Sequence, residues 1–190
     1  EQRVPLPHDG DAPVLSVNRG FSAPVVIRRD LAPDDLVFLA ARDDDPFARY
    51  EAMQDLVVGH LLSAVRGEAA AEGGRAPIRD VLATVLADDG IDDLMRGELL
   101  ILPGETYLAE QLPVADPGRI HTAREELKGW LAQELEGEFL ALHHRASQVD
   151  SGFDAAAKGA RKVKTQALVF LAAGNPALAA QLAAAQYDAS

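Results

Sequence analysis

Apolar residues recur every three or four positions along most of the chain after residue 31, and this spacing places them on one face of an α-helix. The longest stripes follow Pro46, follow Pro117 and precede Gly174. Together they predict a mainly α fold. Their members are Phe47, Tyr50, Met53, Val57, Leu61 and Val65 in the first; Ile120, Leu127, Leu131, Leu135, Phe139 and Leu142 in the second; and Phe153, Ala157, Ala160, Val163, Ala167 and Leu171 in the third.

Helix starts are marked by prolines that follow a capping residue. An Asp or Asn side chain accepts an unpaired backbone N–H of the first turn, and proline suits the first helical position because it has no N–H of its own. Pro33 and Pro77, which follow alanines, predict two weaker starts. The three strong starts are Asp45-Pro46, Asp116-Pro117 and Asn175-Pro176.

Short connections are predicted between consecutive helices, and these favour an antiparallel stack, extended into a curved, solenoid-like array. The one longer interruption is a flexible break over residues 67–75. The expected elements beyond it are a helix that Pro77 opens and Gly90 ends, short helices within 92–102 and 105–112, one long helix from Pro117 to near Ser147, one that Gly174 ends, and an alanine-rich helix over 177–187.

Residues 1–30 differ from the rest of the chain, because prolines recur in them too often for a helix. Two short runs between these prolines, residues 14–17 and 25–27, are rich in Val and Ile and predict short β-strands. An irregular arm packed on the helices is the alternative interpretation. We therefore divide the chain into residues 1–30 and a helical part, residues 31–190.

Composition narrows the classes of partner. The chain has 190 residues, of which 18 are Lys or Arg and 30 are Asp or Glu, so its formal charge is −12. This balance repels a nucleic-acid backbone and an anionic membrane surface, and neither is predicted as a partner. The sequence has no Cys, which excludes thiolate zinc sites and Cys nucleophiles. No apolar run approaches the length of a membrane helix.

Histidines and acidic clusters are the first candidates for metal chemistry. His143 and His144 are adjacent, so a helix points them about 100° apart, and a solvated helix end explains them better than a metal or proton site. His121 and Glu125 lie one turn apart, which favours a charge pair over shared metal binding. The acidic run of residues 43–45 lacks the spacing of a calcium loop and is typical of a helix N-terminus.

One basic cluster and one aromatic residue complete the search. Arg161, Lys162 and Lys164 are interpreted as a solvated face that pairs with acidic neighbours, with recognition of an acidic partner as the alternative. Trp130 lies beside an apolar stripe and is expected in the core. Phosphate loops and the Gly-x-Ser-x-Gly motif of hydrolases are absent from the sequence. The sequence therefore predicts no catalytic, cofactor-binding or metal-binding residue.

Four stretches, in order along the chain, resemble motifs of one known family. Residues 16–27 contain Arg-Gly-Phe-Ser-Ala-Pro-Val, which resembles the family sequence at the end of its β-sandwich domain. Residues 42–54 are similar to the family's Asp-x-Phe-x-Arg-Trp-Glu-Ala-x-Gln helix start, with Tyr50 in place of the Trp. Residues 99–125 resemble its Leu-Pro-x-Glu-x-Tyr-Leu segment followed by an Asp-Pro helix. Residues 161–172 match more loosely, since Lys164-Thr165 replaces an Arg-Asn pair. In these stretches the chain resembles the aminopeptidase N family of bacterial zinc metallopeptidases.

The resemblance implies a parent enzyme that uses zinc to remove N-terminal amino acids from peptides. It implies that residues 1–30 end a β-sandwich domain and that residues 31–190 begin a helical C-terminal domain, which closes over the active site. The family's Gly-x-Met-Glu-Asn and His-Glu-x-x-His motifs are absent here. The resemblance thus assigns zinc and the catalytic groups to the parent enzyme, and it implies a cytoplasmic location.

The expected role is therefore that of a non-catalytic fragment whose partners are the catalytic and β domains of its own parent chain, with peptides as the parent's substrates. The last helix offers mostly alanine methyls where a terminal repeat needs a polar face, so we expect the natural chain to continue past Ser190. Exposed apolar surface at such cut ends predicts self-association of the isolated fragment. The alternatives are a stand-alone helical scaffold that binds a protein partner and a helical enzyme with a site around His143, His144 and Asp150.

Overall fold

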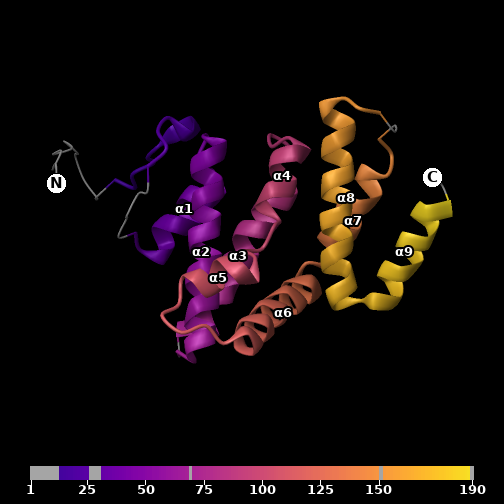
Figure 1. Cartoon of the computed structure of the whole chain (residues 1–190). Helices are drawn as coiled ribbons and strands as arrows, with labels where there is room; N and C mark the ends of the chain where they lie inside the picture. The colour runs from indigo at the N-terminus through magenta and orange to yellow at the C-terminus, as the bar shows by residue number, and fades with distance from the viewer. Residues whose placement is uncertain (1–12, 26–30, 69, 150–151, 189–190) are drawn as a thin grey trace.

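The computed structural model describes residues 13–25, 31–68, 70–149 and 152–188. These residues form a stack of helices, with α1 and α2 on the N-terminal side and α8 and α9 on the C-terminal side (Figure 1). A mainly α stack was predicted, and the structure confirms it. The elements are the 3₁₀ turn η1 (Arg19–Phe21) and the helices α1 (Pro33–Arg42), α2 (Pro46–Arg66), α3 (Ala70–Ala87), α4 (Asp93–Leu99), α5 (Glu105–Glu110), α6 (Pro117–Glu134), α7 (Glu136–Ala146), α8 (Ala155–Gly174) and α9 (Pro176–Asp188).

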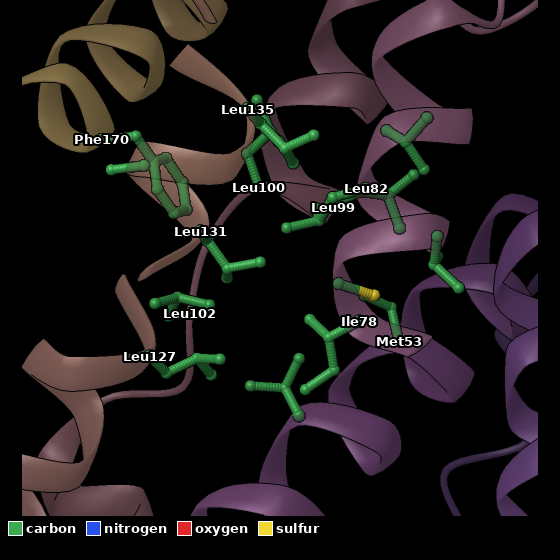
Figure 2. Close-up of a cluster of buried hydrophobic side chains, with 14 of the residues drawn as sticks. Met53, Ile78, Leu82, Leu99, Leu100, Leu102, Leu127, Leu131, Leu135 and Phe170 are labelled. Carbon is green, nitrogen blue, oxygen red and sulfur yellow. The ribbon is translucent and has the colours of Figure 1, made fainter. Parts of the chain in front are cut away.

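One continuous hydrophobic core runs through the stack. Helix α8 packs against α4, α6, α7 and α9, while α2 packs against α1, α3 and α6. Side chains from both halves meet in the middle of the molecule, where Met53 and Ile78 face Leu99, Leu131 and their neighbours (Figure 2). In the C-terminal half, the stacked rings of Phe139 and Phe170 join α7 to α8, with their centroids 4.4 Å apart. Within the described part of the chain, no helix is long and apolar enough to span a bilayer.

The three strong helix starts are confirmed. The Asp45 carboxylate accepts a hydrogen bond from the Ala48 N–H at the start of α2. Asp116 accepts from two backbone N–H groups at the start of α6, and Asn175 accepts from one at the start of α9. Pro33 also begins its helix as predicted.

The predicted break over residues 67–75 was wrong in its extent. Helix α3 begins at Ala70, and Pro77 lies inside it rather than at its start. Close packing of the early turns explains the difference. A Cβ added at Gly74 would lie 3.0 Å from the His60 ring on α2, so Gly74 serves the contact between the two helices rather than a flexible loop.

The long helix predicted from Pro117 to Ser147 was also wrong, because it is two helices. Leu135 leaves helical geometry, with φ −121° and ψ 26°, and separates α6 from α7. The side chain of Leu135 is nevertheless buried, so the apolar stripe is continuous although the backbone turns. In the stripe before Gly174, Phe153 was placed wrongly, since it precedes α8 and is 89% exposed.

The predicted strands lie partly outside the described residues. Residues 14–17 have no regular secondary structure, and 26–27 are not described. A strand needs a neighbouring strand for its hydrogen bonds, and the described residues contain none to pair with. The β-sandwich origin of residues 1–30, and the domain boundary after them, therefore stay predictions.

Candidate functional site

A group of charged side chains joins the segment before the helices to the turn between α1 and α2. We call residues 13–25 the arm and residues 43–45 the acidic turn. The Arg19 guanidinium of the arm lies 3.2 Å from an Asp43 carboxylate oxygen and 2.6 Å from one of Asp44. The Gly20 N–H donates to the Asp45 carboxylate over 2.8 Å. Each acid of the turn thus holds the arm, and we call this assembly the latch.

The backbone of the arm is shaped for this contact. Asn18, Gly20 and Phe21 all have left-handed backbone angles, with φ of 55°, 63° and 52°. Such angles are unfavourable for residues with a Cβ, and they turn Arg19 and the Gly20 N–H toward the acidic turn. The Asn18 side chain supports the bend by accepting from the Ala23 N–H over 3.0 Å. The Phe21 ring lies 5.1 Å from the ring of Phe47 on α2.

The charges of the latch favour one another. The hydrogen bond that Asp44 accepts from Arg19 holds the pKa of Asp44 below the usual value. The same hydrogen bond raises the pKa of Arg19. The pKa of Asp45 is lowered first by the hydrogen bond from the Ala48 N–H, with Gly20 adding to it. The acidic run was interpreted as serving a helix N-terminus, which Asp45 does. Its second role, binding the arm, was missed because the sequence does not show which cation it faces.

Two buried arginines connect the ends of neighbouring helices. Arg49 donates to the carbonyls of Ala40 and Ala41 at the end of α1 and to the Asp88 carboxylate after α3. Arg96 donates to carbonyls at the end of α3 and lies 3.2 Å from Asp93. Both are more than nine-tenths buried. The spacing of apolar residues assigns arginines to the exposed face of a helix, so the burial of Arg49 and Arg96 was not predicted. Arg49 does lie in one of the stretches that resemble the family.

A cavity of about 440 Å³ lies between the acidic turn and the loop that joins α3 to α4. Both signs of charge line it, with Arg42 and Arg49 against Asp43, Asp88 and Asp92 among others. One Asp43 carboxylate oxygen is buried without a hydrogen-bond partner. The cavity therefore lies at a charged junction between the α1–α2 turn and the α3–α4 loop.

The histidine candidates do not form a metal site. His143 was expected at a solvated helix end, but its side chain is 4% exposed and neither ring nitrogen has a hydrogen-bond partner. Burial, with Lys164 and His144 nearby, lowers the pKa of His143. His144 is exposed, and Asp150 lies outside the described residues. The ring of His121 meets Glu105 over 2.9 Å rather than Glu125, which pairs with Lys128.

The remaining candidates have structural roles. Lys162 pairs with Glu98 on α4, in line with the interpretation of a basic face beside acidic neighbours, whereas Arg161 donates to the Gly152 carbonyl. Trp130 packs on the core but is only partly buried, and the Arg75 guanidinium lies 4.7 Å from its ring. Across the ranges that the structure describes, no three His, Asp or Glu side chains are placed to hold a metal ion. The described residues therefore do not fit a zinc centre.

Comparisons with known proteins agree on one family. A family model described as a domain of unknown function with ARM repeats matches residues 33–190. Aminopeptidase N of Caulobacter vibrioides is 38% identical over 156 residues, and aminopeptidase N of Escherichia coli is 30% identical over 177. These alignments cover 81% and 92% of this chain but only 18% and 20% of the relatives. The chain thus spans about a fifth of their length.

A solved structure shares the fold. The crystal structure of Legionella pneumophila aminopeptidase A in complex with aspartic acid superposes with a TM-score of 0.82. The alignment covers 94% of this chain and 22% of that protein, at 24% identity. The arrangement of helices is therefore one that also occurs within a much longer chain.

Proposed function

The chain belongs to the ARM-repeat family found in the C-terminal region of aminopeptidase N proteins, and from this membership we propose that it serves an aminopeptidase as a non-catalytic part. The parent enzyme would remove N-terminal amino acids from peptides. Support comes from the relatives, which are aminopeptidases, and from the described residues, among which no group of His, Asp and Glu side chains is placed to hold a metal ion. On this proposal the metal chemistry belongs to the rest of the parent chain.

The latch is the observation that carries the proposal furthest. Three acids at the head of the helical stack hold a short segment that enters from the preceding part of the chain. Paired charges and a directed backbone hydrogen bond fix an orientation more strictly than apolar contacts do. The latch would therefore set the angle at which the helical body stands against the preceding domain.

A helical body held in this way would bound the space in which the substrate lies. The stack is rigid, because one core runs through it from α1 to α9. We propose that it closes the substrate chamber of the parent enzyme and limits the length of peptide that enters. Its partners are then the catalytic and β domains of the same chain. A cytoplasmic location is part of the same proposal and rests on the resemblance to the bacterial family alone.

The purified 190-residue chain tests the non-catalytic role. We expect no hydrolysis of alanyl-p-nitroanilide above the buffer rate, with or without added Zn²⁺. A zinc-loaded aminopeptidase in the same buffer is the positive control. Hydrolysis that co-elutes with the chain through two different columns, and that a chelator abolishes, would overturn this part of the proposal.

The latch tests the chamber role within the full-length aminopeptidase. Arg19→Ala removes the cation that faces Asp43 and Asp44, so we expect the ratio of kcat/KM for a long peptide to that for a dipeptide to change. Arg66→Ala, which removes an exposed arginine at the far end of α2, is the matched control and should leave the ratio unchanged. An unaltered ratio in Arg19→Ala would contradict the role assigned to the latch.

A further inference from the structure

The first turns of α3 are helical although their residues are poor helix formers. Gly73 and Gly74 lie in this helix, and Pro77 follows within it. Glycine loses more backbone freedom than other residues on entering a helix, and proline cannot donate the hydrogen bond that the carbonyl four residues earlier requires. This is why the sequence alone predicts a break here. Contacts with other helices must therefore hold residues 73–76, which we call the strap.

The strap contacts α2 on one side and α6 on the other. On α2, the His60 ring lies so close to Gly74 that a Cβ added there would come within 3.0 Å of the ring atom Nδ1. On α6, the Trp130 ring faces the Arg75 guanidinium, whose central carbon lies 4.7 Å from the ring centroid. A guanidinium is attracted to the face of an aromatic ring. The strap is therefore held by a close packing contact with His60 and by a cation–π contact with Trp130.

His60 makes the contact with α2 sensitive to protonation. Its Nδ1 atom is buried without a hydrogen-bond partner, so a proton added there would have no acceptor. Burial lowers the pKa of His60, and the positive charge of Arg75 on α3 lowers it further. On the other elements that pack against α2, which are η1, α1, α4, α5 and α6, no charged group of the described residues acts on this ring. The neutral ring is therefore the form that fits under the strap.

Charges near the strap leave Arg75 without a counter-ion. Arg79, one turn further along α3, also lies over the Trp130 ring, at 6.0 Å, but it pairs with Asp80 and with Glu134 of α6. Arg75 has no acidic partner among the described side chains. A proton on His60 would thus add a second positive charge beside a guanidinium that no acid neutralises, and like charges disfavour one another.

We propose that acid releases the strap: protonation of His60 detaches residues 73–76 from α2 and α6 and uncovers the Trp130 ring. As the pH falls through 6.5, the ordinary value for histidine, the open form takes up a proton that the closed form resists, so the equilibrium shifts toward the open form. The part of α3 beyond Pro77 stays in place, because its apolar face belongs to the core. The inference goes beyond the proposed function and holds whether or not the chain bounds an aminopeptidase chamber.

Fluorescence of the 190-residue chain tests the proposal, because Trp130 is its only tryptophan. We expect acrylamide to quench Trp130 about twofold more strongly at about pH 5.5 than at about pH 7.5, while circular dichroism keeps the native helical signal. His60→Gln, which cannot titrate, should be quenched equally at both pH values. His143→Leu removes a buried histidine on α7 and should keep the response of the parent chain. Unchanged quenching in the parent chain, or a full response in His60→Gln, would overturn the proposal.

Hydrogen exchange followed by NMR separates release of the strap from loosening of the whole helix. Over the same pH range we expect the protection factor of the Gly74 amide to fall about tenfold, and that of Val85, later in α3, to change much less. Equal losses at Gly74 and Val85 would contradict a local release.

Arg75→Met tests the repulsion, since it keeps an alkyl chain near Trp130 and removes the charge. The fall in Gly74 protection between the two pH values should then be smaller than in the parent chain. Arg42→Met, which changes an exposed arginine on α1, is the matched control and should leave the fall unchanged. A fall of full size in Arg75→Met would contradict the proposal. None of these readouts depends on peptidase activity, so the proposed function can fail while this inference stands.

Discussion

At the scale of single residues, buried charges determine how the N-terminal half of the stack is joined. The Arg49 guanidinium donates hydrogen bonds both to carbonyls at the end of α1 and to the Asp88 carboxylate after α3. Hydrogen bonds from Gly90 and Arg49 keep the pKa of Asp88 below its usual value. Removing one partner from such an arrangement leaves a charge and two carbonyls without their donors, which costs more than losing a surface pair.

Arg49→Met tests this arrangement. The methionine fills much of the volume but donates no hydrogen bond, so we expect the free energy of unfolding to fall by about 3 kcal/mol. Urea denaturation followed by circular dichroism measures the change. Arg66→Met is the matched control on the same helix, since Arg66 is about half exposed and lies 3.8 Å from Glu68. The control should change stability by less than about 0.5 kcal/mol. Equal losses in the two variants would contradict the role of Arg49.

The burial of His143 predicts that the free energy of unfolding depends on pH. Its pKa is lowered in the folded chain by burial, from an ordinary value of 6.5. As the pH falls through 6.5, the unfolded chain therefore takes up a proton that the folded chain does not, and stability decreases. His60, whose pKa burial also lowers, acts in the same direction.

Replacing His143 separates its share of this effect. In His143→Leu, the loss of unfolding free energy between about pH 7 and pH 5 should be smaller than in the parent chain. His144→Leu changes an exposed neighbour on the same helix and serves as the control. A pH dependence that is identical in the parent chain and in His143→Leu would show that His143 protonates equally in both states.

At the scale of elements, close approach between helices depends on glycines. A Cβ added at Gly159 on α8 would lie 2.9 Å from the Asp93 Cβ and 3.1 Å from the backbone N of Leu94 on α4. Gly159→Ala should therefore destabilise the chain by about 1–3 kcal/mol, because α4 and α8 must separate. Gly59→Ala on α2 meets no atom within 4 Å and should stabilise it by up to about 1 kcal/mol. Thermal unfolding of both variants measures the difference, and a neutral Gly159→Ala would contradict the tight crossing.

The contacts of the latch predict that the Gly20 backbone amide in the arm is protected from exchange with solvent. The Gly20 N–H is directed to Asp45, and Arg19 holds the arm in place. In Arg19→Ala we expect the Gly20 amide to exchange with solvent about tenfold faster, while amides in the middle of α2 keep their rates. Hydrogen exchange followed by NMR measures both. Unchanged exchange at Gly20 would show that the arm is held by other contacts, such as that between Phe21 and Phe47.

Helix starts and buried faces were predictable from the sequence because both depend on local chemistry. Asp45, Asp116 and Asn175 cap their helices as expected, and Leu135 keeps its place in the apolar stripe. The turn at Leu135 itself and the early start of α3 were not predictable, since packing between helices decides them. The same limit applies to the site. The acids of the latch were visible in the sequence, but their pairing with Arg19, 24 or more residues away, was not.

At the scale of the whole molecule, the helices form one rigid stack with the latch at its head. Core residues from α1 to α9 belong to a single cluster, so close packing is continuous from one end of the stack to the other. A continuously packed stack of helices is better suited to form a fixed boundary of a substrate chamber than to act as a moving catalytic element. This shape, together with membership of the aminopeptidase N family, supports the chamber role proposed for it.

The most direct test is to delete residues 33–190 from the full-length aminopeptidase that carries this sequence and to measure kcat/KM on a dipeptide and on a decapeptide. The dipeptide rate reports whether the catalytic part still folds. If the helical stack limits entry, the ratio of the decapeptide value to the dipeptide value will change markedly while dipeptide hydrolysis persists. An active deletion variant whose ratio equals that of the intact enzyme would contradict the account.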